Sequence, residues 1–308
     1  MINFYKTIDG KMKALEDIES GCWINVIDPT SEEIVTLCER YEFEKDFIMA
    51  ALDEEETSHV DIEDSQTFII SDVPYVQNEG ENIYYSTIPM GIVVTPEYIL
   101  TISLKETVII KEFIEGTVKN ANTAFRTQFV LYLQLKIATK YLLYLKQIDR
   151  LSKYVEKKLH KSMRNKELIQ LLDLEKSLVF FSTSLKANEA TLEKMMRGRV
   201  IKLYEEDQDL LEDVLIEVKQ AIEMSTIYSN ILSGTMDAFA SIISNNLNIV
   251  MKVLTSITIL MAIPTMISSF YGMNVVDLPM PFTWFPFALS GAITLVVGII
   301  LWKKGMFK

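Results

Sequence analysis

Two long uncharged stretches decide the fold, and the first reads VLTSITILMAIPTMISSFYGMNVV over residues 253–276. The second reads LPMPFTWFPFALSGAITLVVGIILW over residues 278–302. A helix of about 20 apolar residues crosses the hydrocarbon core of a bilayer, so each stretch is long enough for one span. Two such runs in succession are longer than the buried helices of ordinary soluble proteins. We therefore predict two transmembrane helices, at residues 251–273 and 282–302.

The lysines around these stretches predict their orientation. Lys252 lies just before the first uncharged stretch, and three of the six residues of the tail at 303–308 are lysine, whereas the loop at 274–281 has none. Positively charged residues concentrate on the cytoplasmic side of a membrane, which predicts cytoplasmic N- and C-termini and an extracellular loop in a plasma-membrane protein. The chain begins without an apolar signal segment, so we expect residues 1–250 to stay in the cytoplasm.

The overall composition excludes some classes of function. The chain carries a net charge of −12, which argues against a nucleic-acid partner, because phosphate binding needs clustered lysine and arginine. Cys22 and Cys38 form no C-x-x-C pair and fit a reduced interior. No glycine-rich nucleotide motif and no G-x-S-x-G motif occurs in the sequence, so we predict no enzyme activity.

Residues 1–120 have the pattern of a cytoplasmic α+β domain. Runs rich in β-branched and aromatic residues predict strands, and the Asp-Pro-Thr-Ser-Glu-Glu run from Asp28 predicts the start of a helix. The predicted strands are Ile2–Ile8, Cys22–Ile27, Thr67–Val73, Ile83–Val94 and Tyr98–Ser103, and the predicted helices are Ser31–Tyr41 and Glu44–Leu52.

Residues 121–250 form a second, helical region. The sequence has no proline from Glu97 to Ile263, and its pattern predicts helices at Phe125–His160 and Asn165–Met196. A third helix, over residues 207–271, would be a stalk about 98 Å long that continues through the first span. A lone helix of that length is unstable, so it must pack against its neighbours or against copies of itself.

A stripe of small and polar side chains runs along this stalk helix. Its members recur at alternating steps of four and three residues, a spacing that keeps them on one face of supercoiled helices. The stripe consists of Asp237, Ser241, Ser244, Asn248, Met251, Thr255, Thr258, Ala262, Thr265 and Ser269.

The stripe has two interpretations, and both require an oligomer. Small hydroxyl-bearing residues let membrane helices pack closely, and they also line hydrophilic pores. The unbroken length of the stripe favours a pore, as do Asp237 and Asn248, which are costly to bury in a dry seam. A pore without carboxylates inside the membrane suits a hydrated ion, and Mg²⁺ gives up its water reluctantly.

The motif at the outer end of the first span is Tyr271-Gly272-Met273-Asn274. With the two-span plan and Met251-Lys252-Val253-Leu254-Thr255 at the inner end, it resembles the CorA family of magnesium transporters. The resemblance covers the whole chain plan and is closest from about residue 205 to residue 274.

This resemblance implies a funnel-shaped homopentameric Mg²⁺ channel in the bilayer. Asn274 would form an entrance ring of side-chain oxygens, and Tyr271, Gly272 and Met273 would complete the selectivity motif. The stripe would line the pore, with Met251 and Leu254 as expected gates, because Ala262 stands where a bulkier gate would be expected. Cytoplasmic Mg²⁺ would close the channel at acidic sites between subunits. The residues implied for those sites are Asp213 and, on a neighbour, Asp53, Glu54, Glu55 and Glu56.

Two alternatives stay open at this point. The transported ion could be Co²⁺, Ni²⁺ or Zn²⁺, although softer metals favour histidine and cysteine, and the only histidines are His59 and His160, outside both spans. The second alternative is a membrane-anchored sensor whose N-terminal domain carries the function.

Overall fold

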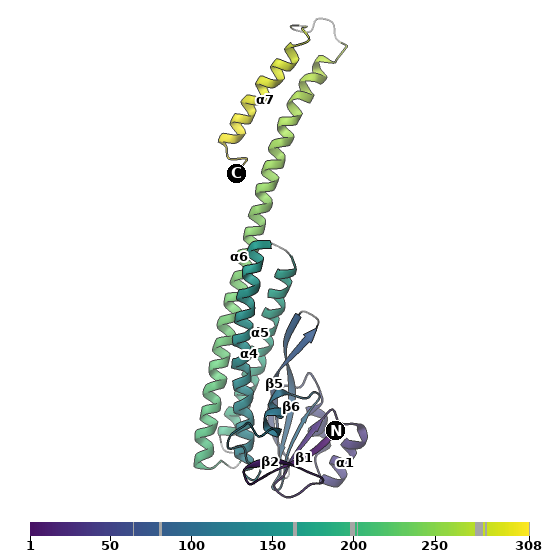
Figure 1. The fold of residues 1–308 in the computed structure, drawn as a ribbon, viewed down its shortest axis with the longest axis vertical. Coiled ribbons are helices and arrows are strands. Elements are labelled where there is room, and N and C mark those ends of the chain that lie inside the picture. The colour runs from purple at the N-terminus through teal and green to yellow at the C-terminus, as the bar shows by residue number, and fades with distance from the viewer. Residues whose placement is uncertain are drawn as a thin grey trace. The chain divides into compact units, whose positions relative to one another are not determined.

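The computed structural model describes residues 1–63, 65–79, 82–162, 165–197, 201, 203–274, 280 and 282–307 (Figure 1). The chain divides into two compact units. Unit 1 is Met1–Ser233 and unit 2 is Gly234–Lys308. Their boundary lies inside one long helix, so the subdivision of the chain at residues 120 and 250 stays a prediction.

Unit 1 is built on a seven-stranded sheet in the order β2-β1-β3-β7-β6-β5-β4. The pair β3–β7 is parallel, and the other pairs are antiparallel. The strands are β1 (Ile2–Ile8), β2 (Lys11–Leu15), β3 (Trp23–Ile27), β4 (His59–Glu63), β5 (Gln66–Glu79), β6 (Asn82–Val94) and β7 (Ile99–Ser103).

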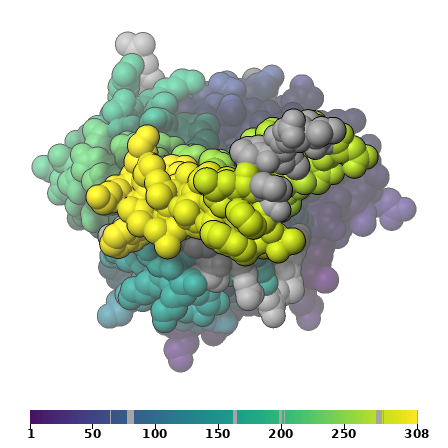
Figure 2. All heavy atoms as spheres, turned by 90° about the horizontal axis from the view of Figure 1, so that it is seen from above, coloured from purple at the N-terminus to yellow at the C-terminus, as the bar shows by residue number. Residues whose placement is uncertain are grey.

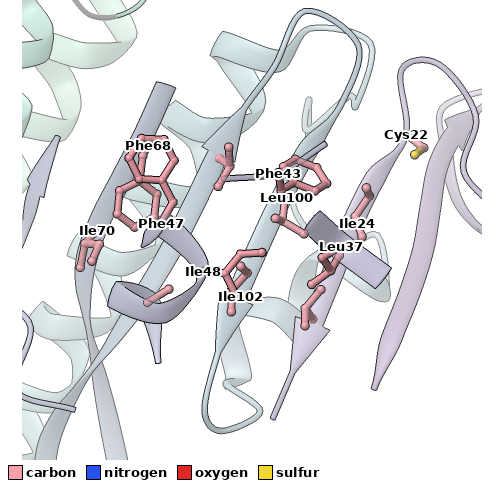
Figure 3. Close-up of a cluster of buried hydrophobic side chains, with 13 residues drawn as sticks. Cys22, Ile24, Leu37, Phe43, Phe47, Ile48, Phe68, Ile70, Leu100 and Ile102 are labelled. Atoms are coloured by element: carbon pink, nitrogen blue, oxygen red, sulfur yellow. The ribbon is translucent and has the colours of Figure 1, made fainter. Parts of the chain in front are cut away.

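Two short helices, α1 (Ser31–Tyr41) and α2 (Lys45–Ala51), cover one face of the sheet. Thr30 and Glu33 close a capping box that starts α1, as the sequence predicts. Phe47 of α2 stacks on Phe68 of β5 with ring centroids 4.5 Å apart, at one end of the apolar core shown in Figure 3.

Longer helices cover the opposite face. Trp23 points toward α3 (Val108–Ile114) and α4 (Arg126–Ser162), where its ring lies 5.3 Å from that of Phe129. α5 (Asn165–Met196) is fixed to the sheet by Asn188, which exchanges two hydrogen bonds of 2.9 Å with the backbone of Asp72. Because neighbouring strand residues point to opposite faces, the sheet is buried between two helical layers.

The helix α6 (Glu205–Tyr271) begins in unit 1 and runs into unit 2. Its first turn carries three acidic residues, which favour a helix N-terminus. Inside unit 1 it packs on α5, where Ser225 Oγ donates a 2.9 Å hydrogen bond to the Leu178 carbonyl.

Unit 2 consists of the second part of α6 and of α7 (Phe285–Lys303), which lie side by side (Figure 2). A Cβ added at Gly298 of α7 would lie 3.8 Å from Leu260 of α6, and Tyr271 and Phe285 pack with ring centroids 6.1 Å apart. The most apolar windows of the two helices are 6% and 0% buried, unlike core helices of a soluble protein. The structure confirms two apolar helices, each long enough to cross a membrane.

The predicted elements agree with the structure except at a few places. The helices Ser31–Tyr41 and Asn165–Met196 and the strand Ile2–Ile8 have the predicted bounds. The strand predicted to end at Val73 instead continues to Glu79. The strands β2 and β4 and the helix α3 were not predicted.

Candidate ion pathway along α6

The stripe on α6 faces away from α7. All ten stripe residues, from Asp237 to Ser269, are exposed in the single chain. A different side of the helix faces α7, where Ser256 is fully buried and Leu260 approaches Gly298. The stripe is therefore not a seam between the two apolar helices of one chain. Its free face is available to copies of the same helix or to water.

Four of the six hydroxyl groups of the stripe have a common orientation. Thr255, Thr258 and Thr265 each donate a hydrogen bond to the carbonyl four residues earlier, at 2.8, 2.9 and 3.0 Å. Ser241 does the same toward the carbonyl of Asp237 at 3.0 Å. Each hydroxyl uses its hydrogen inside the helix, so its oxygen can only accept from outside. A row of acceptors suits the outward-pointing hydrogens of water molecules around a cation.

The predicted gate residues lie in the N-terminal half of the apolar segment of α6. Met251 and Leu254 are 51% and 55% exposed. Ala262, on the same face as Thr255 and Thr258, is also exposed. The structure of one chain places no side chain opposite these three, so the position of a constriction stays a prediction.

Pro264 lies within α6 without ending it. A proline has no N–H to donate, so the carbonyl of Leu260 has no helical partner four residues later. Leu260 faces α7.

The Tyr271–Asn274 motif closes α6 and is only partly described. Gly272 has no positive φ, but a Cβ there would lie 3.2 Å from the Ser268 carbonyl oxygen. Tyr271 turns its ring toward Phe285 of α7, whereas Met273 and Asn274 are exposed. Of the loop beyond Asn274, residues 275–279, which include Asp277, and residue 281 lie outside the described residues.

The residues implied for regulation lie in unit 1. Asp53, Glu54 and Glu55 follow α2 as an exposed turn, Glu56 is half-buried, and Asp213 is exposed on α6. Glu54 lies 3.8 Å from Lys105, and Glu56 lies 3.5 Å from His59. Within the part of one chain that the structure describes, no three acidic, histidine or cysteine side chains are grouped to hold a metal ion. A metal site between subunits stays a prediction.

The seam between α6 and α7 was not predicted. Ser256 and Gly298 let the two helices approach, and Thr294 of α7 has a buried hydroxyl oxygen without a hydrogen-bond partner among the described residues. The signal was present, because Ser256, Leu260 and Ile263 continue the alternating steps on a second face. This second face was not recognised in the sequence, because the stripe from Asp237 to Ser269 is the more polar one.

Comparisons with known proteins agree with this arrangement. The chain is 28% identical over 293 residues to the cobalt/magnesium transport protein CorA of Methanocaldococcus jannaschii. This match covers 92% of this chain and 90% of that protein. It is 31% identical over 145 residues to the protein of the same name from Thermotoga maritima, covering 42% of this chain and 41% of that protein.

Solved structures extend the likeness to the whole chain. The complete structure of the CorA magnesium transporter from Methanocaldococcus jannaschii superposes with a TM-score of 0.80 at 25% identity, covering 98% of this chain and 96% of that one. The full-length CmaX protein shares the fold, with a TM-score of 0.72 at 14% identity over 97% of this chain and 96% of its own.

The family model described as CorA-like Mg²⁺ transporter protein matches residues 19–304. This match confirms the resemblance seen in the sequence, and it also confirms the prediction that the protein is not an enzyme. Because the match spans most of its length, the chain belongs to the family of CorA-like Mg²⁺ transporter proteins.

Proposed function

We propose that five copies of this chain form a channel that carries hydrated Mg²⁺ across the plasma membrane. The exposed stripe on α6 lines the pore around the common axis, and α7 lies on the lipid side. The N- and C-termini are cytoplasmic. The observation that carries the proposal is the row of hydroxyl oxygens on the face of α6 that α7 leaves free.

The chemistry of the pore favours a hard, hydrated cation. Unit 2 contains neither histidine nor cysteine, the side chains that softer metals prefer. Neutral hydroxyl and amide oxygens hold a hydration shell without binding the ion too tightly to release it. Asn274 forms the outer ring, and Asn248 forms a second ring near the inner end of the pore. The membrane potential supplies about 2.3 kcal/mol per charge per 100 mV, so no nucleotide is needed to drive inward flow.

A relative named as a cobalt/magnesium transport protein keeps Co²⁺ as the second candidate ion. Ni²⁺ and Zn²⁺ rank below Co²⁺ as candidate ions because of their ligand preferences. Cytoplasmic Mg²⁺ closes the channel in this proposal. It binds between subunits near Asp213 and the Asp53–Glu56 turn of a neighbour.

The decisive experiment is ion flux into liposomes that contain the purified full-length chain. Mg²⁺, Co²⁺, Ni²⁺ and Zn²⁺ are compared at one membrane potential, in the wild type and in Asn274→Ala. We expect Mg²⁺ flux in the wild type and at least about a tenfold loss in the variant, with the oligomer intact on size-exclusion chromatography.

Asn246→Ala is the matched control, because Asn246 is exposed on α6 but lies off the stripe. Its flux should equal that of the wild type. Undiminished Mg²⁺ flux in Asn274→Ala would remove the asparagine ring from the mechanism. Faster Co²⁺ than Mg²⁺ flux would make cobalt the substrate.

A further inference from the structure

One side of α5 is left uncovered in the part of the chain that the structure describes. Its exposed residues recur at steps of three and four from Ile169 to Arg197, so they share one face of the helix, which we call the free α5 face. In the N-terminal half of this face, four large apolar side chains are 43% to 56% exposed. They are Ile169, Leu172, Val179 and Phe180. An exposed apolar patch of this kind marks a site of association.

The C-terminal half of the free α5 face is basic. Lys186 and Arg197 are exposed there, and their side chains form no hydrogen bond or ion pair with a described residue. Lys194 lies between them and donates a 2.7 Å hydrogen bond to a backbone carbonyl of β4. The apolar half carries one further lysine, Lys176, which lies 3.9 Å from Asp173 of the same helix. Two positive charges in the basic half are therefore free to pair with a negatively charged partner.

The exposed side of α6 within unit 1 is divided in a similar way. The alternating steps of the stripe continue back from Asp237 to Asp209, and all of these residues are exposed. We call this extension the free α6 face. It begins with two carboxylates and contains no basic residue, and the two isoleucines near its end are 54% and 59% exposed. Its members are Asp209, Asp213, Ile216, Gln220, Glu223, Ile227 and Asn230, with Ile231 beside the last of them.

Contacts within unit 1 show that α5 and α6 run antiparallel (Figure 1). Ser225 Oγ of α6 donates a 2.9 Å hydrogen bond to the Leu178 carbonyl of α5. Lys219, six residues earlier on α6, lies 4.0 Å from Glu189, eleven residues later on α5. The start of α6 therefore lies beside the end of α5.

The charged halves of the two faces consequently lie at one level, and so do the apolar halves. Measured from the hydrogen bond that joins α6 to α5, Asp209 lies about 24 Å away along α6, and Arg197 lies about 28 Å away along α5 in the same direction. In the opposite direction, Ile231 and Leu172 each lie about 9 Å from that bond. Both faces are exposed, so they do not cover each other within one chain.

Each face fits the other better than it fits itself. In a symmetric dimer, a face packs on the same face of the partner. A two-fold axis along the helices would place like charges together, and a two-fold axis across the helices would place a charged half on an apolar half. Rotation about an axis along the helices instead brings the free α5 face of one copy onto the free α6 face of the next. Opposite charges and apolar side chains then meet at their own levels, and a contact between unlike faces closes into a ring.

We propose that unit 1 of neighbouring copies associates through these two faces, so that a second copy of this chain covers each free α5 face. Arg197 lies opposite Asp209 of the next copy, and Lys186 lies between the levels of its Asp213 and Glu223. The apolar half of the free α5 face packs on the isoleucines near the end of the free α6 face. The inference rests on the proposed oligomer, and it specifies which surfaces of unit 1 join the copies.

Disulfide formation between two differently tagged full-length chains tests this contact. One chain carries Leu172→Cys and the other carries Ile231→Cys, each in a background of Cys22→Ala and Cys38→Ser, and the two chains are co-expressed. Each chain has a single thiol, so a disulfide between the two tags can only join different copies. We expect mild oxidation to link the two tags, because Leu172 and Ile231 lie at one level on the facing surfaces.

Val35→Cys co-expressed with Ile231→Cys is the matched control. Val35 is 51% exposed on α1, which covers the other face of the sheet, so this pair should give no mixed disulfide. A yield with Leu172→Cys no higher than in this control would overturn the proposal. Equally strong linkage between two Ile231→Cys chains would also overturn it, because the α6 faces would then pack on each other.

Charge reversal tests the basic and acidic halves of the contact. Arg197→Glu or Asp209→Arg, introduced into both chains, places like charges opposite each other and should lower the yield of the mixed disulfide at least about threefold. The two reversals combined in every chain exchange the charges across the contact, so they should restore the yield. Lys11→Glu makes the same change of charge as Arg197→Glu on an exposed residue of β2, and it should leave the yield unchanged.

Equal yields in all of these variants would refute the charge match and with it the proposal, as would a combined variant as weak as the single ones. Amine crosslinking and Mg²⁺ flux are measured on the same samples. Five linked chains and normal flux without a mixed disulfide would remove this contact and leave the channel proposal intact. A chain that forms no oligomer at all would remove the channel proposal as well, so the two failures are distinguishable.

Discussion

At the scale of single residues, Gly272 is the position of the Tyr271–Asn274 motif that least tolerates an added side chain. A Cβ at this position would lie 3.2 Å from the Ser268 carbonyl oxygen, closer than an ordinary contact. Gly272→Ala should therefore shift the end of α6 and move Asn274 away from its place in the ring. We expect Mg²⁺ flux into liposomes to fall about tenfold, a change of about 1.4 kcal/mol in the barrier.

Gly291→Ala of α7 is the control for this substitution, because nothing lies within 4 Å of a Cβ built there. It should conduct like the wild type. Equal flux in both alanine variants would show that the close approach at Gly272 has no role in positioning the motif.

Asp72 gives a prediction on pH. It is 8% exposed between β5 and the helices, and burial raises the pKa of its carboxyl, while a hydrogen bond from Ser184 acts weakly in the other direction. The folded chain therefore keeps this proton to a higher pH than the unfolded chain does. The free energy of unfolding falls as pH rises from the ordinary aspartate pKa of about 3.9 through the raised one.

Asp72→Asn removes this dependence, because an amide does not ionise and can still accept from Ser184. At neutral pH the variant should be more stable than the wild type, and the difference should vanish below the ordinary aspartate pKa of about 3.9. Thermal unfolding of both proteins from acidic to neutral pH measures this. A variant less stable than the wild type at neutral pH would show that the charged carboxylate is stabilising.

At the scale of elements, a threonine-to-valine substitution should have different effects on the stripe of α6 and on α7. Thr258 is exposed on the stripe, with its hydroxyl donating to the Leu254 carbonyl at 2.9 Å, so its oxygen is left to accept from water. Thr258→Val keeps the shape and removes this acceptor from every copy. We expect Mg²⁺ flux to fall several-fold without loss of the oligomer, because hydration of the pore weakens.

The same substitution on α7 is the matched control. The Thr294 hydroxyl oxygen is buried and without a partner among the described residues, so Thr294→Val removes an unsatisfied group. Its flux should equal that of the wild type, and its thermal stability should be equal or higher. If Thr294→Val reduced flux as strongly as Thr258→Val, the distinction between a pore face and a packing face would be wrong.

The elements also show why the sequence predicted some parts of the fold and missed others. The spans and the long helices have strong periodic patterns over many residues, so they are readable without tertiary information. β2 and β4 are short and rich in charge, and they form only as edge strands on β1 and β5. Such strands depend on their neighbours more than on their own residues.

β5 shows how tertiary context overrides a local signal. The strand predicted at Thr67–Val73 stops just before Pro74, yet β5 continues through this proline to Glu79. β4 pairs with β5 only as far as Ile70, so beyond that residue one side of β5 has no strand next to it. A proline is tolerated where no ladder hydrogen bond needs its missing N–H.

At the scale of the whole molecule, the stripe could be predicted from the sequence because its spacing is regular, but its partner could not. Periodicity identifies which side chains share a face of α6 and does not identify what that face meets. The structure of one chain excludes its own α7 as the partner and leaves the face exposed. In the proposed channel, the oligomer completes the pathway, and its stoichiometry sets the pore radius.

Cysteine crosslinking tests the arrangement of the oligomer directly. Ser244 lies on the stripe, before the first uncharged stretch, so Ser244→Cys should form disulfides between neighbouring copies in a background of Cys22→Ala and Cys38→Ser. Mild oxidation should produce pairs of linked chains, because each copy offers one thiol, and a short bifunctional thiol reagent should do the same. Amine crosslinking of the same sample should give a ladder that stops at five chains.

Leu295→Cys in the same background is the control, because Leu295 is 63% exposed on α7 and in a pentamer would face lipid. It should give no disulfide between copies, although the amine ladder should be unchanged. If Leu295→Cys crosslinked and Ser244→Cys did not, α7 would lie at the axis and the stripe would face lipid. Hydroxyl oxygens pointed at acyl chains could not carry a hydrated cation, so this single reversal would remove both the pore and the ion proposed for it.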